Sequence, residues 1–341
     1  MSKQLVLHVT VGIGALALAS AAFGQTEKAP RRGLPFYGVE SIDNALRDAK
    51  GSAGSAKEMP AAKSEGAREF NRVMSICGPT TDWDDVELYS KVKPTPAFVN
   101  GRQPAVAQIQ WRANLASRLG NGVDPGNVDG QRWCTGTLIA PNLFLTAAHC
   151  FQAQDDKQGW QTPRRKVSGG TQLLKAQDLA PLMQLNFRYQ VNGSDPKKRL
   201  RTADVYPIVR LVEYGFDEQK PIDYAIVEVG KDAQGRLPDA KYAITAFDAS
   251  EASLKKAKQL TIIQHPHGEP KKVMAGPSVG VEDELLLYKD LDTLGGSSGS
   301  GVLDEAGKVI AVHVAGGCYE LGGANRGVPL TLVRKVSQIV K

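Results

Sequence analysis

Aromatic residues and clustered positive charge are both scarce in this sequence of 341 residues. Phe, Trp and Tyr make up 6% of it, and no run of five or more Lys or Arg occurs, although the formal net charge is +6. A dedicated nucleic-acid groove is therefore not expected. With 42% apolar and 23% charged residues, the composition excludes a wholly disordered chain, a collagen-like repeat and a polytopic membrane protein. The length predicts two domain-sized units, at about 150 residues per domain.

The sequence begins with a mostly apolar stretch. Lys3 precedes an apolar run over residues 5–23, and small residues stand where a signal peptidase cuts. We interpret residues 1–24 as a secretory signal peptide. His8 and Thr10 weaken the alternative, an uncleaved membrane anchor. The protein is therefore expected to be secreted or periplasmic, with no membrane attachment after cleavage, in a compartment where disulfides persist.

The rest of the chain divides into a polar segment and a strand-rich body. Residues 25–76 hold few large apolar side chains, so we expect a linker or pro-segment that is largely disordered. From about residue 99, short apolar stretches alternate with turn residues, and residues 330–340 have helical spacing. This predicts an all-β body, a barrel or sandwich pair, with one C-terminal helix. The predicted strands cover residues 105–111, 135–139, 143–146, 205–212, 225–229, 259–264, 285–288, 302–303 and 309–314.

Histidine is the commonest general base near neutral pH, and this chain has five. His8 would leave with the signal peptide. The remaining candidates are His149, His265, His267 and His313. His149 precedes Cys150, and a strand, a Pro-Asn corner and a returning strand fit between Cys134 and Cys150. We therefore predict a Cys134–Cys150 disulfide that holds the loop of His149. No Cys-x-x-Cys pair occurs, which disfavours a zinc site.

Ser298 lies in a Gly-Gly-Ser-Ser-Gly-Ser-Gly segment, residues 295–301. Its composition would fit a flexible linker, but the segment runs directly into predicted core strands. Glycines let the backbone turn sharply and bring N–H groups close to a substrate. A serine nucleophile needs a base, and the base needs an orienting group. Asp223 opens an apolar strand and is the preferred carboxylate, whereas Asp204 and Asp217 are competitors in more polar surroundings.

Three of these segments resemble motifs of the chymotrypsin/trypsin-like serine endopeptidases. Residues 146–150 are similar to the histidine motif, 223–227 to the aspartate motif and 296–300 to the serine motif, in the family's order. The form of the serine motif, and the segment 263–268, resemble the bacterial branch that includes glutamyl endopeptidases. The similarity covers about residues 99–341.

The resemblance implies a fold of two packed six-stranded antiparallel β-barrels. Barrel one would cover about residues 99–235 and barrel two about 240–341, within a protease domain spanning 77–341. The first barrel would carry the histidine and the aspartate, and the second would carry the serine. The active site would then lie between the barrels.

The resemblance also implies a secreted serine endopeptidase that works through an acyl-enzyme. Ser298 would attack the peptide carbonyl, His149 would move the proton, and Asp223 would orient the imidazole. The backbone N–H groups of Gly296 and Ser298 would bind the oxyanion. Trypsin-like zymogens carry an acid directly before the serine, which pairs with a new N-terminal ammonium. Ser297 stands at that position here, so we expect maturation without that ion pair.

Two residues implied by the resemblance give opposite expectations for the substrate side chain. Asp292, six residues before Ser298, would select Arg or Lys, whereas His313 would help to bind an acidic side chain. Asp292 could instead be a solvated loop residue, and His313 a strand histidine that shapes the pocket. The side-chain preference therefore stays open.

By elimination, Cys77 and Cys318 are predicted to form the second disulfide and to tie the extension to barrel two. We expect protein or peptide substrates and a monomer, with no organic cofactor and no metal. One alternative is a catalytically inactive homologue that acts as a binding module, which the complete set of three motifs disfavours. Another is a metal-dependent hydrolase using His265 and His267, which are otherwise read as turn residues.

Overall fold

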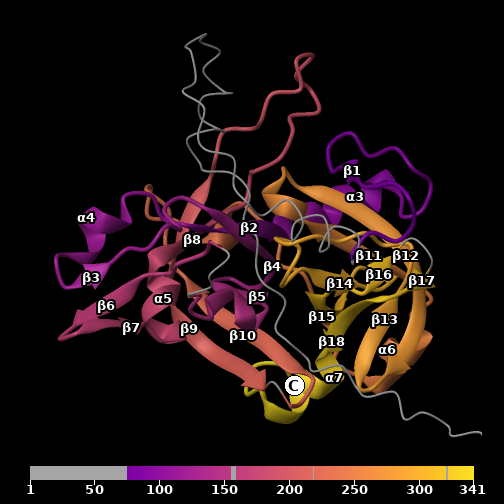
Figure 1. Cartoon of the computed structure of the whole chain (residues 1–341). Coiled ribbons are helices and arrows are strands. Elements are labelled where there is room, and N and C mark those ends of the chain that lie inside the picture. Colours follow the sequence, from indigo (N-terminus) through magenta and orange to yellow (C-terminus); the bar gives the residue numbers. More distant parts are fainter. Residues whose placement is uncertain (1–74, 155–158, 218, 320–321) are drawn as a thin grey trace, which may run out of the picture. The chain divides into compact units, whose positions relative to one another are not determined.

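The structure is a computed structural model that describes residues 75–341, except 155–158, 218 and 320–321 (Figure 1). The predicted signal peptide and nearly all of the predicted linker lie outside the described residues. Within the described part, strands dominate and the α-helices have at most seven residues. No helix among the described residues is both long and apolar enough to cross a membrane.

Six antiparallel strands form the first barrel, which closes in the order β10-β5-β4-β2-β8-β9. Their bounds are β2 Val106–Trp111, β4 Arg132–Ala140, β5 Leu143–Thr146, β8 Met183–Asn186, β9 Val205–Asp217 and β10 Ile222–Val229. β4 and β5 form a hairpin around the Pro141–Asn142 corner, with Ala140 opposite Leu143. Proline presets φ at such a corner and asparagine tolerates the bend.

The second barrel belongs to a seven-stranded sheet in the order β1-β12-β11-β14-β15-β18-β13. An additional β12–β13 pairing closes six of these strands, and β1 pairs with β12 outside the ring. The bounds are β1 Asp84–Asp85, β11 Gln259–Gln264, β12 Lys272–Glu282, β13 Leu285–Tyr288, β14 Gly301–Leu303, β15 Val309–Ala315 and β18 Asn325–Pro329. Two six-stranded antiparallel barrels with a short C-terminal helix confirm the predicted fold class.

Smaller elements connect and flank the barrels. The α-helices are α3 Pro96–Arg102, α4 Leu115–Leu119, α5 Ala176–Leu179, α6 Glu251–Lys256 and α7 Leu330–Val336. The 3-10 helices are η1 Gln103–Ala105, η2 Ala148–Phe151, η3 Ala180–Leu182, η4 Pro238–Ala240 and η5 Pro266–Gly268. The short strands β3 Val123–Asp124, β6 Arg164–Val167 and β7 Gly170–Leu173 form one sheet, and β16 Cys318–Tyr319 pairs with β17 Gly322–Gly323.

The C-terminal helix is shorter than the apolar spacing predicts. α7 ends at Val336 rather than near residue 340, and the Ser337 N–H makes the last helical bond to Val333 O. The Ser337 hydroxyl then accepts from the N–H groups of Ile339 (3.0 Å) and Val340 (2.8 Å). A serine side chain that bonds nearby backbone N–H groups competes with the next helical turn and ends the helix.

A buried lysine joins the two barrels. Lys271, directly before β12, is fully buried, and its Nζ donates to Gln103 O and Phe187 O, each at 2.9 Å. Gln103 lies in η1 and Phe187 follows β8, so one side chain of the second barrel anchors two segments of the first. A buried amine is tolerated where its hydrogen bonds are satisfied, as they are here.

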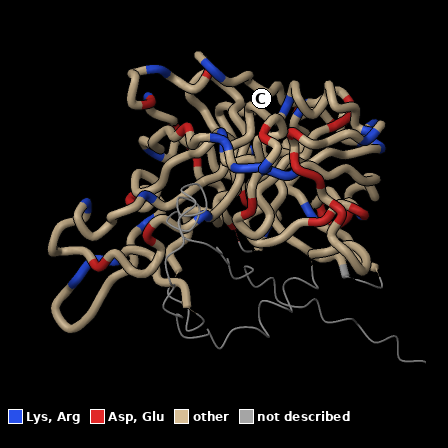
Figure 2. The backbone as a smooth tube through the Cα atoms, turned by 90° about the horizontal axis from the view of Figure 1, so that it is seen from above, with Lys and Arg blue, Asp and Glu red and all other residues tan. Residues whose placement is uncertain are grey.

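Positively and negatively charged residues are interspersed along the described part of the chain. Figure 2 shows Lys and Arg positions interspersed with Asp and Glu along most of it. Several ion pairs are largely exposed to solvent, such as that of Lys91 with Asp84, whose side chains are 52% and 35% exposed. Exposed pairs of this kind contribute little to stability, so the fold depends on its buried strands and disulfides.

Candidate active site

His149 and Asp223 meet at the end of a strand pair in the first barrel. β5 leads into η2, which carries His149, and Asp223 lies near the start of β10. The two strands are antiparallel, with Ala225 opposite Thr146, so extending this register by two residues brings Asp223 beside the start of η2. The long sequence separation between the two residues is bridged by ordinary strand pairing.

The Asp223 carboxylate holds His149 at two points. Its Oδ2 lies 2.6 Å from His149 Nδ1, and its Oδ1 accepts from the His149 backbone N–H at 3.0 Å. Both side chains are mostly buried, with 15% and 16% exposure. An ionised carboxylate can only accept, so the proton of a neutral ring lies on Nδ1 and leaves Nε2 as an acceptor. That is the tautomer that a general base requires.

The segment around Ser298 lies against the loop that leads to His149. Ser298 O accepts from the Thr135 N–H at 2.9 Å, and it lies 3.9 Å from the Sγ of Cys150. Gly299 has φ +86°, and a Cβ there would come within 2.0 Å of Thr146 Oγ1. Only glycine fits this close approach, so the backbone of the serine segment and the start of the histidine loop are in contact.

Thr135, in β4, is a junction between the barrels that the sequence did not indicate. Its Oγ1 donates to Gly296 O at 2.7 Å and accepts from the His265 N–H at 3.0 Å. Its backbone N–H holds Ser298 O, and its carbonyl accepts from Thr146 Oγ1. One residue thus binds the serine segment, the histidine loop and the turn at η5. Its place directly after Cys134 is the only signal in the sequence.

The peptide between Gly295 and Gly296 has a fixed orientation. The Gly295 carbonyl accepts from the His267 N–H at 2.5 Å. In a trans peptide the C=O and N–H point in opposite directions, so the Gly296 N–H is aimed away from His267. Among the described residues, neither the Gly296 N–H nor the Ser298 N–H donates to a protein acceptor. These are the two donors that the resemblance assigns to an oxyanion.

Asp292 is buried and faces the N-terminal segment of the described chain. Its side chain is 0% exposed. Oδ1 accepts from the Cys77 N–H at 2.6 Å and Oδ2 from the Asp82 N–H at 3.3 Å. Burial raises its pKa to about 6, and the nearby Asp82 charge adds to this. Asp292 is therefore not a solvated loop residue, and both of its oxygens already have partners.

His313, in β15, is a buried and neutral histidine. It is 3% exposed, and its Nδ1 is hydrogen-bonded to the Tyr288 hydroxyl. Burial, together with the charge of His149, lowers its pKa to about 3. Ser297, directly before Ser298, is bonded within its own turn: the Ser297 hydroxyl accepts from the Leu294 N–H at 3.1 Å, and the Ser297 N–H donates to Leu294 O.

The four cysteines form the same two pairs that the sequence suggests. Cys134 is bonded to Cys150 and Cys77 to Cys318. The sulfurs of Cys134 and Cys150 lie within 4.8 Å of a His149 ring nitrogen. Because these sulfurs share a disulfide, they offer no thiolate to a metal ion. The cluster is thus a brace for the histidine loop.

His265, directly before η5, and His267, within it, contribute to the turn. His265 is fully buried, its Nδ1 bonds Glu269 O at 3.1 Å, and burial lowers its pKa well below the usual range. His267 adopts φ +55° and holds Gly295 through its backbone. In the described residues neither belongs to a group of ligands arranged for a metal ion. His267 therefore acts on the serine segment through its peptide N–H.

Comparison with known proteins gives one family and several distant structures. The family model described as a trypsin-like peptidase domain matches residues 134–312, a little more than half of the chain. The uncharacterized protein y4fB of Sinorhizobium fredii (strain NBRC 101917 / NGR234) is 26% identical over 199 residues, 55% of this chain. The match spans about a quarter of that relative's own length, 26%.

Two solved structures resemble the described fold. A Glu endopeptidase in complex with MPD has 16% identity and a TM-score of 0.43, covering 76% of this chain and 96% of that one. Human heparin binding protein has 15% identity and a TM-score of 0.44, covering 68% of this chain and 88% of that one. The range matched by the family model contains His149, Asp223 and Ser298.

Proposed function

Because this chain belongs to the family of trypsin-like peptidase domains, we propose that it is a serine endopeptidase with His149, Asp223 and Ser298 as its catalytic residues. The observation that carries the proposal is the contact of 2.6 Å between His149 Nδ1 and Asp223 Oδ2. It supplies an oriented base in a fold whose family hydrolyses peptide bonds. Asp204 and Asp217, the competing carboxylates, bond instead to Lys241 and to Gln219.

The reaction follows from these groups. Ser298 Oγ attacks the peptide carbonyl carbon while His149 Nε2 takes the hydroxyl proton. The imidazolium then gives that proton to the leaving amine, which departs with the C–N bond electrons and leaves an acyl-enzyme. Water, deprotonated by the same imidazole, attacks the ester carbon. The bond from that carbon to Ser298 Oγ then breaks, the acid is released, and the imidazolium returns its proton to Ser298 Oγ. Asp223 stabilises the imidazolium in both halves of the cycle.

The Gly296 and Ser298 N–H groups are proposed to bind the oxyanion. They have no protein acceptor among the described residues, so they can meet the developing charge without breaking an internal bond. A preorganised donor of this kind contributes about 3 kcal/mol to transition-state stabilisation. Gly296 has φ +97°, and a Cβ there would come within 2.5 Å of His265 O, so a side chain would displace the donor.

The primary substrate side chain is proposed to lie between the segment of Asp292 and the strand of His313. An Arg or Lys side chain would have to compete for carboxylate oxygens that already accept from Cys77 and Asp82. A neutral His313 offers no positive charge to an acidic side chain. In a peptide-library digest, cleavage after Arg or Lys would restore Asp292 as the selector. Cleavage after Ala or Leu would remove both residues from that role.

A fluorophosphonate probe tests the proposal. We expect one label per folded chain, mapped to Ser298 by mass spectrometry, and none on Ser298→Ala. That variant should lose peptidase activity by roughly 10⁶-fold, because the members of such a set act as a unit. A folded wild-type chain that takes no label and cuts no peptide would favour the alternative, a catalytically inactive homologue acting as a binding module.

Export is part of the proposal. Two disulfides fit an oxidising compartment, periplasmic or extracellular.

Ser297 binds its own turn through Leu294, which supports maturation without an ammonium–carboxylate switch. A buried ion pair between a new N-terminus and this segment, found in the mature enzyme, would contradict that part.

A further inference from the structure

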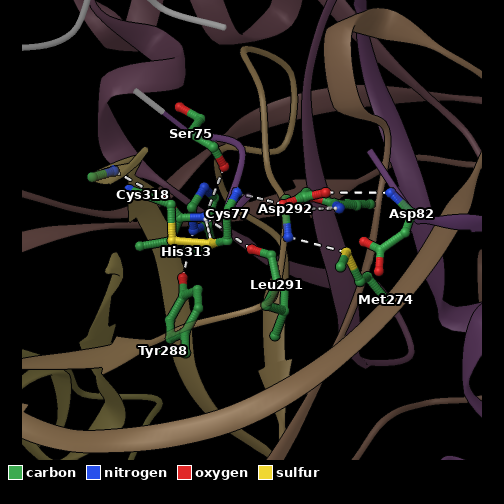
Figure 3. Close-up of a disulfide and its surroundings, with 12 residues drawn as sticks. Ser75, Cys77, Asp82, Met274, Tyr288, Leu291, Asp292, His313 and Cys318 are labelled. Atoms are coloured by element: carbon green, nitrogen blue, oxygen red, sulfur yellow. Dashed lines mark hydrogen bonds between the residues drawn. A yellow bond between two sulfur atoms is a disulfide. The ribbon is translucent and has the colours of Figure 1, made fainter. Parts of the chain in front are cut away.

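Residues 75–82, which we name the strap, lie against the segment that leads to Ser298 (Figure 3). Ser75 O accepts from the Thr293 N–H at 3.1 Å. The Cys77 N–H donates to Asp292, and so does the Asp82 N–H. The Cys77–Cys318 disulfide fixes the same stretch covalently. Three backbone groups of the strap and one sulfur are thus bonded to the second barrel.

The Asn325 side chain connects the strap to both neighbouring segments. Its Nδ2 donates to Ser75 O at 3.0 Å and to Leu291 O at 2.8 Å. Its Oδ1 accepts from the N–H groups of Gly317 (2.9 Å) and Cys318 (3.1 Å). Asn325 is 0% exposed, so this buried amide joins the strap to Leu291 on one side and to Gly317 and Cys318 on the other.

The ionised carboxylate of Asp292 is destabilised by its buried position. It is fully buried, and burial dominates the rise of its pKa to about 6. Its side-chain partners are the two backbone N–H groups of the strap. A buried acid whose contacts lead to one segment is suited to holding that segment.

The other end of the same loop is held without the strap. Gly295 O is bonded to His267 N–H, and Gly296 O to Thr135 Oγ1. The oxyanion donors therefore depend on η5 and β4. Residues 291–293 are held partly by the strap and partly by the second barrel, where Gln264 Nε2 donates to Asp292 O at 2.7 Å and the Asp292 N–H lies 3.0 Å from Met274 Sδ. Loss of the strap should affect the binding of the substrate side chain more than the chemistry at Ser298.

We propose that the strap and Asp292 are positioning elements that order residues 291–293 and 316–318, the two walls of the primary substrate pocket. This proposal rests on the proposed function. In it, the acid six residues before Ser298 does not select a basic substrate. It anchors the strap, which the Cys77–Cys318 disulfide also ties covalently to the second barrel.

Asp292→Ala tests this in the full chain at pH 8. We expect KM for a peptide substrate to rise about tenfold, with kcat within about threefold, because pocket order is lost and the serine and its oxyanion donors are kept. Asp292→Asn keeps one acceptor, so its KM should lie between those of Asp292→Ala and the wild type. Asp85→Asn is the matched control: it lies in the adjoining segment, but its partner is Lys272, so its KM should stay unchanged.

Hydrogen exchange gives a readout that does not need catalysis. The Thr293 amide, which donates to Ser75 O, should exchange at least tenfold faster in Asp292→Ala, while the Gly299 amide, bonded to His313 O, should not change. Should Asp292→Ala fail to fold, Cys77→Ser/Cys318→Ser carries the same comparison. The proposal would be overturned if Asp292→Ala left both the KM and the exchange rate of the Thr293 amide unchanged. It would also be overturned if Asp85→Asn raised KM as much as Asp292→Ala does. If the wild type takes no fluorophosphonate label, the proposed function fails, and the exchange result still decides whether the strap orders the loop.

Discussion

Replacing Asp223 by asparagine should nearly abolish activity without removing a single heavy atom from the site. The reason lies in the two contacts of the carboxylate. One oxygen accepts from the His149 backbone N–H, which is a donor under all conditions, and the other accepts from Nδ1–H. An asparagine side chain has one acceptor and one donor end, so it cannot repeat both contacts.

The fixed backbone donor decides how the new amide turns. The Asn oxygen stays on the His149 N–H, and the NH₂ group then faces Nδ1, which must give up its proton to become an acceptor. The proton moves to Nε2, and the ring can no longer accept from Ser298. From comparable tautomer traps we expect kcat to fall about 10⁴-fold, which corresponds to about 5.5 kcal/mol in the barrier.

The assay is kcat and KM on a peptide substrate near pH 8, with circular dichroism to show that the fold is kept. Asp217→Asn is the matched control, because its carboxylate is 37% exposed and bonds the Gln219 N–H; its kcat should stay within twofold. If Asp223→Asn kept more than a tenth of the wild-type kcat, the roles derived for His149 and Asp223 would be wrong. An equal loss in Asp217→Asn would have the same consequence.

Two further predictions concern stability. Gly299→Ala should lower the free energy of unfolding by several kcal/mol, since φ is +86° and the new Cβ would meet Thr146 Oγ1 at 2.0 Å; a urea midpoint equal to that of the wild type would contradict the packing described. Burial lowers the pKa of Lys271 to about 7, so the folded state binds fewer protons than the unfolded state between about pH 7 and 10.5. The free energy of unfolding of the wild type, relative to that of Lys271→Met, should therefore rise with pH above 7, by up to about 1.4 kcal/mol per pH unit. Urea titrations at pH 7 and 9 that give the same difference between the two proteins would exclude this.

Much of the fold follows from local sequence pattern. Strands in which apolar side chains predominate, such as β11 and β15, are predictable because most of their side chains are buried in a barrel core. β12 was missed because Gly276, Pro277 and Gly280 interrupt it. Gly276 is required by a tertiary contact, since a Cβ there would lie 2.4 Å from Lys289 O. A close approach of this kind leaves no signature in the neighbouring residues.

The candidate site divides in the same way. His149, Asp223 and Ser298 lie in recognisable motifs. In the structure the His149 ring is hydrogen-bonded to the Asp223 carboxylate. The environment of Asp292 was not predictable, because its partner Cys77 is 215 residues away in sequence. Thr135 and Asn325 have ordinary local sequences, and their importance comes from segments that converge on them only in the folded chain.

The bond between Cys77 and Cys318 has a consequence for the durability of the molecule. It closes a covalent ring with a sequence separation of 241, which includes the first barrel, every strand of the second barrel before β18 and each residue proposed to act in the reaction. A single cut in any surface loop of this ring, including a cut by a second copy of the enzyme, leaves the two pieces joined. Such a nicked molecule would run as one band without reductant and as two bands with it. The molecule could therefore be cut once by a protease without being taken apart.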